Sequence, residues 1–144
     1  MQVQVAAQER NWAMAAHLTA LVAIAGLPFG HVLGPLVVYL VKGHESEFVG
    51  EHARASLNYQ ITVSLFFIIA IIVGVAIAFG VFIPMSVSSS GSTEAGLSIF
   101  VFWAAFVVAV LLVLLFSLIF IIMGTVAASE GRPYTYPFAI RFLR

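Results

Sequence analysis

The chain has 144 residues, of which about 62% are hydrophobic and only 8% are charged, and its formal net charge is zero. A soluble domain usually carries about a quarter charged residues, so six basic and six acidic side chains are too few to cover a soluble bundle. The neutral balance argues against nucleic acid as a partner, and the lack of cysteine excludes disulfides, thiol nucleophiles and thiolate metal sites. We therefore expect one all-α integral membrane domain over residues 1–144, in contact with the lipid bilayer.

The first apolar stretch follows a polar tail of residues 1–10 and is interrupted. Gly26-Leu-Pro-Phe-Gly30 and Gly34-Pro35 break the run, and proline both removes a backbone donor and restricts the residue before it. Two interpretations stay open. One is a single broken span. The other, which we favour, is a hydrophobic hairpin of two short helices at about 12–27 and 32–42, turning at Pro28–Gly30.

The next segment, residues 46–56, has the pattern of an amphipathic helix. Ser46 is a plausible N-cap, and Glu47 in the first turn suits the helix dipole. Phe48, Val49 and His52 recur at three- and four-residue spacing. Such a helix lies in the membrane interface or leads directly into the next span. An ordinary polar loop is the alternative.

Two long uncharged segments follow, at about 57–83 and 97–128. Crossing roughly 30 Å of hydrocarbon takes about 20 residues, so each is long enough to span. Pro84 should end the first, and the serine-rich stretch 84–96 should form an external polar loop. Lysine and arginine lie in residues 42–56 and in the C-terminal tail 129–144, which places both on the cytoplasmic side.

Polar side chains near the cytoplasmic ends need partners. The amides of Asn58 and Gln60 would bond to neighbouring helices of this chain or to another subunit. The tail from Gly131 to Arg144 mixes aromatic residues, prolines and arginines. Tyrosine prefers the headgroup region and arginine pairs with lipid phosphate, so we expect an interface anchor, with a docking segment for a partner as the alternative.

Chemistry has few candidates in this sequence. His44, Glu47, Glu51 and His52 could share a helical face and suit a divalent metal, although a helix start between 44 and 47 would spoil the alignment. His17, alone in an apolar segment, is expected to be structural. Because the long spans contain no Asp, Glu, Lys or Arg, we expect no enzyme, no metal and no cofactor.

Two motifs resemble a known family. They are Gly34-Pro-Leu-Val-Val-Tyr-Leu-Val-Lys42 with the segment from Glu45 to Gln60, and Ala127-Ala-Ser-Glu-Gly131 with Tyr134-Thr-Tyr-Pro-Phe-Ala-Ile-Arg141. Together they resemble an uncharacterised family of small bacterial membrane proteins related to the twenty-kilodalton subunit of the chloroplast Tic protein translocon. The resemblance implies four hydrophobic helices in the bacterial cytoplasmic (inner) membrane and hints at protein translocation. The chain departs from that pattern at Lys42-Gly-His44 and His52-Ala-Arg54.

The expected function is that of a non-enzymatic accessory or scaffold subunit that binds another membrane protein or itself. A component of a translocation or pore-forming assembly is the first alternative, and a metal-binding protein or enzyme using the His44–His52 cluster is the second. The residues expected to carry interaction or packing are Lys42, Phe48, Val49, His52, Arg54, Asn58, Gln60, Tyr134, Tyr136, Pro137 and Arg141.

Overall fold

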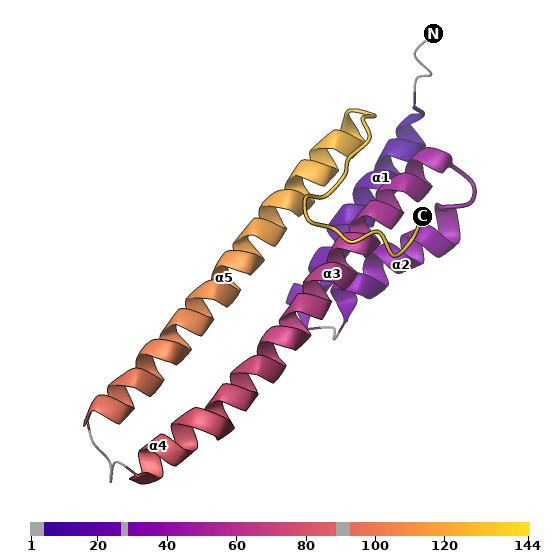
Figure 1. Ribbon diagram of the computed structural model, residues 1–144. Coiled ribbons are helices and arrows are strands. Elements are labelled where there is room, and N and C mark those ends of the chain that lie inside the picture. The colour runs from indigo at the N-terminus through magenta and orange to yellow at the C-terminus, as the bar shows by residue number, and fades with distance from the viewer. Residues whose placement is uncertain (1–4, 27–28, 89–92) are drawn as a thin grey trace. The chain divides into compact units, whose positions relative to one another are not determined.

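The computed structural model describes residues 5–26, 29–88 and 93–144, and these residues form helices and no strand, which confirms the all-α fold (Figure 1). The elements in chain order are α1 (Ala7–Leu18), the 3₁₀ helix η1 (Thr19–Ala25), α2 (Gly30–Lys42), α3 (Glu47–Ile77), the π-helical turn η2 (Ala78–Phe82), α4 (Ile83–Ser88) and α5 (Thr93–Ser129).

The chain divides into two compact units, each described by itself. Unit 1 consists of Met1–Ser64 with Ser117–Arg144, and unit 2 of Leu65–Phe116. Two continuous helical stretches are long and apolar enough to cross a membrane: Glu47–Met85 with 39 residues and Thr93–Ser129 with 37. At 1.5 Å per residue each is roughly 55 Å long, well above the ~30 Å of a hydrocarbon core. The expectation of one transmembrane domain stays a prediction.

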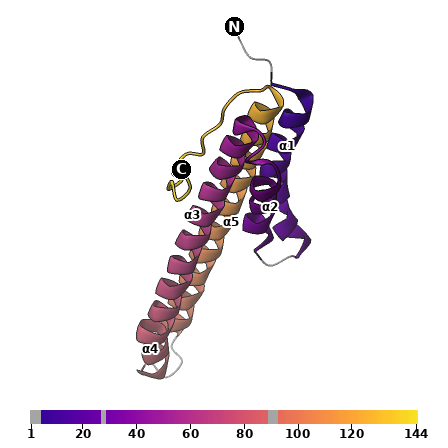
Figure 2. The same ribbon diagram turned by 90° about the vertical axis from the view of Figure 1, so that its right-hand side faces the viewer.

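The N-terminal hairpin is confirmed, and its two arms lie side by side in both views (Figures 1 and 2). Gly34 explains the close approach, because a Cβ there would lie 2.4 Å from the Thr19 carbonyl oxygen. Only glycine fits at such a distance. Of the predicted turn, Pro28 lies outside the described residues, while Phe29 precedes α2 in a left-handed conformation with φ 58°.

The first helix begins earlier than predicted. We expected a polar tail through residue 10 and a helix from about residue 12, whereas α1 starts at Ala7. The reason is local, since the Glu9 carboxylate accepts the Ala6 backbone N–H at 3.0 Å and satisfies a donor that would otherwise be unpaired at the helix start. Hydrogen bonding to the Ser46 side chain, and then to this Ala6 N–H, holds the pKa of Glu9 below its ordinary value.

The amphipathic segment and the first span form one helix. Residues 47–56 are the first part of α3 and continue into the span without a break. This agrees with the prediction of a helix that leads directly into the next span. Ser46 lies at the start, where its carbonyl accepts the Gly50 N–H at 2.9 Å.

Pro84 does not end the first span, as we had predicted. The chain passes through the π-helical turn η2, and Pro84 lies at the second residue of α4. The π-helical turn directly before Pro84, in which the Ile83 N–H bonds to the Ala78 carbonyl, allows the helix to accommodate a residue that has no N–H of its own. Helix therefore occupies residues 84–88 of the predicted loop, and α5 begins at Thr93 rather than 97. Residues 89–92 of that loop lie outside the described residues.

The core of unit 1 consists of small and β-branched side chains. Ala16, Val38, Val49 and Ala53 are at most 3% exposed and pack together, with Trp12, Ala15 and Tyr39 against them. Alanine and glycine at the contacts let helix backbones approach closely, as in membrane helix packing. This core brings α1 and α2 against the start of α3 and so fixes the position of His17 beside His52.

Candidate functional site

The C-terminal tail, residues 130–144, is bound to the first half of α3. The Asn58 side chain accepts the backbone N–H groups of Phe142 and Leu143 at 3.1 and 2.9 Å and donates to the Leu143 carbonyl at 2.9 Å. Four residues further along α3, the Thr62 hydroxyl accepts the Ile140 N–H at 2.9 Å. Figure 2 shows the tail returning from the end of α5 toward α3. Backbone groups that no secondary structure pairs are satisfied here by side chains of α3.

A buried chain of side chains lies under the same tail. His17 of α1 is fully buried and His52 of α3 is 1% exposed, and their Nε2 and Nδ1 atoms lie 2.8 Å apart. The other nitrogen of His17 lies 2.8 Å from the Tyr136 hydroxyl, and the other nitrogen of His52 lies 3.1 Å from the Arg132 carbonyl oxygen. Gly124 of α5 leaves room for this arrangement, since a Cβ there would lie 3.0 Å from the His17 ring.

The direction of the hydrogen bonds in this series of side chains follows from the last acceptor. A carbonyl oxygen only accepts, so His52 Nε2 donates to the Arg132 carbonyl. With both imidazoles in their neutral form, His52 Nδ1 then accepts from His17 Nε2, and His17 Nδ1 accepts from the Tyr136 hydroxyl. Every donor points the same way, from Tyr136 toward Arg132. These hydrogen bonds therefore join two points of the tail, Tyr136 and Arg132, through His17 of α1 and His52 of α3.

Aromatic rings enclose the chain. Tyr59 stacks on Tyr136 with centroids 4.4 Å apart and planes 16° apart, and its hydroxyl lies 2.9 Å from Ser117 Oγ. Tyr134 meets Tyr136 edge-on at 5.0 Å, and Phe48 covers His52 at 4.6 Å. Such pairs contribute about 0.5–1.5 kcal/mol each beyond the area they bury.

The tail tyrosines are held in their neutral form. Burial raises the pKa of Tyr136 above its ordinary value, and the Ser56 hydroxyl offsets only part of that rise. Burial also raises the pKa of Tyr134. A phenol with a raised pKa is a weak source of phenolate, so neither tyrosine is prepared as a nucleophile or base. The Tyr134 hydroxyl and Gln60 Nε2 are buried without a hydrogen-bond partner in the described part of the chain.

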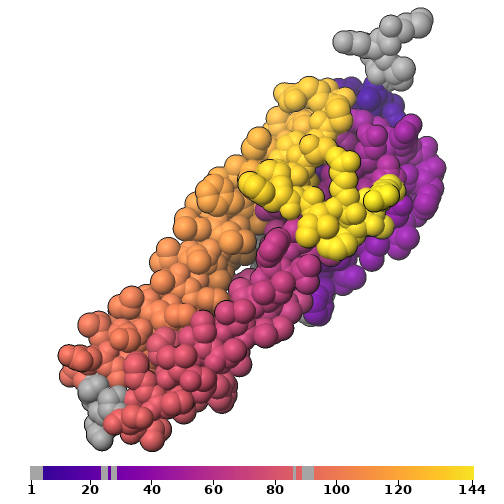
Figure 3. Space-filling model, viewed as in Figure 1, coloured from indigo at the N-terminus to yellow at the C-terminus, as the bar shows by residue number. Residues whose placement is uncertain are grey.

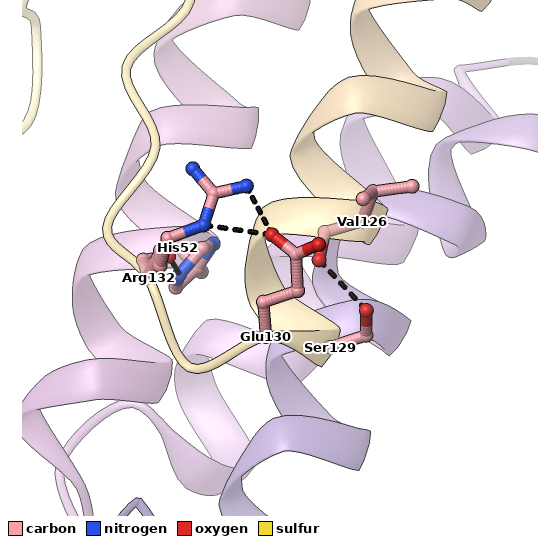
Figure 4. Close-up of polar contacts among 5 residues, drawn as sticks. All are labelled: His52, Val126, Ser129, Glu130 and Arg132. Carbon is pink, nitrogen blue, oxygen red and sulfur yellow. Dashed lines mark hydrogen bonds and ion pairs between the residues drawn. The ribbon is translucent and has the colours of Figure 1, made fainter.

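At the start of the tail, the Arg132 side chain turns away from the network. The Arg132 guanidinium pairs with the Glu130 carboxylate through Nε at 2.7 Å, while the Arg132 carbonyl faces His52 (Figure 4). Ser129 Oγ donates to the Val126 carbonyl at 2.7 Å and closes the last turn of α5. Gly131 follows with φ 71°, a left-handed conformation suited to glycine after a helix.

Several of the predicted interaction residues meet in this region. His52, Asn58, Tyr134 and Tyr136 belong to the network or its enclosure, Phe48 packs on His52, and Pro137 follows Tyr136 in the tail. The others lie elsewhere. Val49 belongs to the core, and Gln60 is buried on α3 two residues after Asn58. Lys42 pairs with Glu45 at 2.6 Å and lies 5.9 Å from the Trp12 ring, while Arg54 and Arg141 lie outside the network. Whether these residues carry the function stays a prediction.

The alternative metal cluster does not form. The His44 ring contacts Tyr39 at 5.5 Å, ahead of the helix start at Glu47, and both nitrogens of His52 are engaged by His17 and Arg132. No group of three or more histidine, aspartate or glutamate side chains converges on a metal position among the described residues.

Several participants were not predicted as site residues, among them His17, Tyr59, Thr62 and Ser117. The sequence held one signal for His17, because an imidazole in an apolar segment needs a hydrogen-bond partner. Its partners are 35 and 119 residues away in the chain, so no local pattern could identify them.

Comparison with known proteins assigns the chain to a family. Residues 8–143 match the MamF/MmsF family, described as the magnetosome magnetite crystal formation protein family. No curated protein and no solved structure matches the chain. The predicted resemblance to the family related to the Tic translocon is wrong. It depended on residues such as Gly34 and Tyr136, which build the helical scaffold and hold the tail, and scaffold residues say little about function. The chain belongs to the magnetosome magnetite crystal formation protein family.

Proposed function

We propose that this protein is a non-enzymatic, multi-pass protein of the magnetosome membrane that acts in magnetite crystal formation as an accessory or scaffold subunit. The family match over residues 8–143 supports a role in magnetite crystal formation, and therefore a place in the magnetosome. Two helices of sufficient length and apolar character support insertion in the bilayer. The magnetosome membrane derives from the inner membrane, and we infer that residues 42–56 and the tail face the cytoplasm, because lysine and arginine gather there.

One observation supports a scaffold role over an enzymatic one. Four polar side chains of unit 1 are buried and bonded to one another or to the tail: His17, His52, Asn58 and Thr62 are each at most 5% exposed. An active site needs a group within hydrogen-bond reach of a substrate. Here the two buried histidines are occupied by the hydrogen bonds under the tail, and the outer surface of unit 1 is rich in apolar side chains such as Leu40, which is 61% exposed.

The proposed partner is another protein of the same membrane. Exposed apolar side chains face lipid or protein in a bilayer, and long helices bearing small residues suit lateral contact with other helices. A scaffold of this kind influences crystals through the proteins that it holds in place. Its loss should therefore change crystal size or number while leaving the membrane itself intact.

Deletion of the gene, followed by electron microscopy of crystal dimensions, tests this proposal. We expect altered crystals in the deletion strain and restoration by the wild-type gene. Tyr136→Phe should restore them as well, because the ring and its stacking on Tyr59 remain. Crystals unchanged by deletion would contradict a role in crystal formation. Loss of complementation by Tyr136→Phe at normal protein level would instead favour chemistry at the hydroxyl.

A further inference from the structure

We propose that the end of the tail, residues 137–144, is a binding surface for anionic phospholipid. In this arrangement Phe138 enters the membrane interface, and Arg141 and Arg144 contact headgroup phosphates. The proposal rests on the chain lying in a membrane, which is part of the proposed function, and not on any role in crystal formation. Figure 3 shows the tail on the outer surface of the chain.

Phe138 carries the first observation. Its side chain is 89% exposed, and its backbone is left-handed with φ 62°. That conformation is costly for a bulky residue, and exposure of a phenyl ring to water is also unfavourable. Contacts inside the chain compensate for neither, since the ring points outward. Insertion into a membrane interface would remove most of the exposed apolar area.

Phe29 shows the same combination independently. Among the described residues, Phe29 and Phe138 are the non-glycine positions with positive φ, and Phe29 is 71% exposed. It lies at the turn of the apolar hairpin, where contact with lipid is expected from the composition of residues 12–42. Two strained and exposed phenylalanines, from segments more than a hundred residues apart in the sequence, thus have the same pattern.

The arginines carry the second observation. Arg132, at the start of the tail, is paired with Glu130. Arg141 and Arg144 are exposed, and neither makes an ion pair within the described ranges 5–26, 29–88 and 93–144. Unpaired arginines beside exposed aromatic and aliphatic residues, here Ile140 and Phe142, match a headgroup layer, with phosphate for the guanidinium and an apolar boundary for the rings.

The surface is also ordered in advance. Asn58 and Thr62 hold the backbone of residues 140, 142 and 143, so Arg141 projects from a fixed segment and Arg144 directly follows it. Binding then orders only side chains, which lowers its entropic cost. A protein partner is a weaker fit, because the exposed patch is short and combines net positive charge with single apolar side chains instead of a contiguous apolar surface.

The depth of residue 138 can be measured directly, because the chain has no native cysteine. The full-length protein is labelled with a nitroxide at Phe138→Cys or, as control, at Thr135→Cys, and reconstituted in vesicles of phosphatidylcholine with phosphatidylglycerol. Accessibility to oxygen and to an aqueous nickel complex reports depth. We expect the label at 138 to be accessible to oxygen and protected from nickel, and the label at exposed Thr135 to be accessible to nickel.

The charge requirement is tested by preference for phosphatidylglycerol over phosphatidylcholine, measured by competition among lipids bound to the purified protein. Arg141→Gln and Arg144→Gln should each lower that preference about five-fold. Arg132→Gln, whose charge is already paired, should change it little. The proposal would be overturned by nickel access at 138 equal to that at 135, or by equal losses from all three variants. It would also be overturned by a label at 138 that is immobilised against a second copy of the chain. Normal crystals in the deletion strain would contradict only the proposed function.

Discussion

Asn58→Leu should release the end of the tail from α3. The amide makes three hydrogen bonds to the backbone of Phe142 and Leu143, at 2.9, 3.1 and 2.9 Å, and is 5% exposed. Each bond contributes about 1 kcal/mol net. The tail is only partly buried, so water replaces some of what is lost, and we expect about 2 kcal/mol in total. That corresponds to about a thirty-fold larger open population of the tail.

Trypsin cleavage measures how often the end of the tail detaches from α3. Cleavage after Arg141 releases residues 142–144, the segment that Asn58 holds, whereas Arg132 precedes a proline and resists cleavage. When opening and closing are fast compared with cleavage, the rate follows the open population. In detergent, the tripeptide should therefore appear about thirty-fold faster from Asn58→Leu than from wild type, as followed by mass spectrometry.

Two controls define the result. Thr62→Val removes one bond to the Ile140 N–H and should accelerate release by about five-fold, from the same ~1 kcal/mol per bond. Ser98→Ala alters an exposed hydroxyl in unit 2 that bonds only its own helix, and should have no effect. Equal release from wild type and Asn58→Leu would refute the assignment of Asn58 as the clamp on the tail.

Three further outcomes are expected. Tyr136→Phe should destabilise unit 1 by about 1 kcal/mol in thermal melts, because His17 Nδ1 loses its donor while the ring stack remains; an unchanged melting temperature would argue against the donor chain. Because burial raises the pKa of Tyr136 above its ordinary 10.0, its neutral hydroxyl contributes fully to the stability of the fold below pH 10.0. That contribution should fall as pH rises above 10.0 and be lost through the folded pKa, so stability should depend less steeply on pH in Tyr136→Phe than in wild type. Parallel pH profiles of the two proteins would contradict this. Gly34→Ala places a Cβ 2.4 Å from the Thr19 carbonyl and should cost about 1–3 kcal/mol, whereas Gly80→Ala, with open space around it, should not; similar melting temperatures would refute the close packing of the hairpin.

The helical architecture was predictable because its signals are local. Charge-free runs long enough for a bilayer identify the two long helices, and paired glycines and prolines identify the hairpin. Helix ends were less accessible to sequence reasoning. Pro84 appeared to be a stop signal, yet the π-helical turn before it allows the helix to continue. The early start of α1 depends on one carboxylate, Glu9, bonding back to Ala6.

The site was predictable only in part, because its contacts join distant segments. Asn58 was identified as an amide in need of partners, but the sequence offered helices or another subunit, and the structure supplies the backbone of the tail. His17 and His52 were considered separately, and nothing in their local surroundings indicates that they meet. Pairing of side chains across 35 or more residues follows from helix packing, which sequence spacing does not fix.

The proposed contact with another protein of the magnetosome membrane is tested most directly by photo-crosslinking in isolated magnetosome membranes. Photo-reactive residues are placed singly at exposed positions of unit 1, such as Leu40, and adducts are identified by mass spectrometry. A scaffold subunit should give a reproducible adduct with one other protein of that membrane, from neighbouring positions and not from buried Val38. Adducts with lipid or with this chain alone would contradict the accessory role.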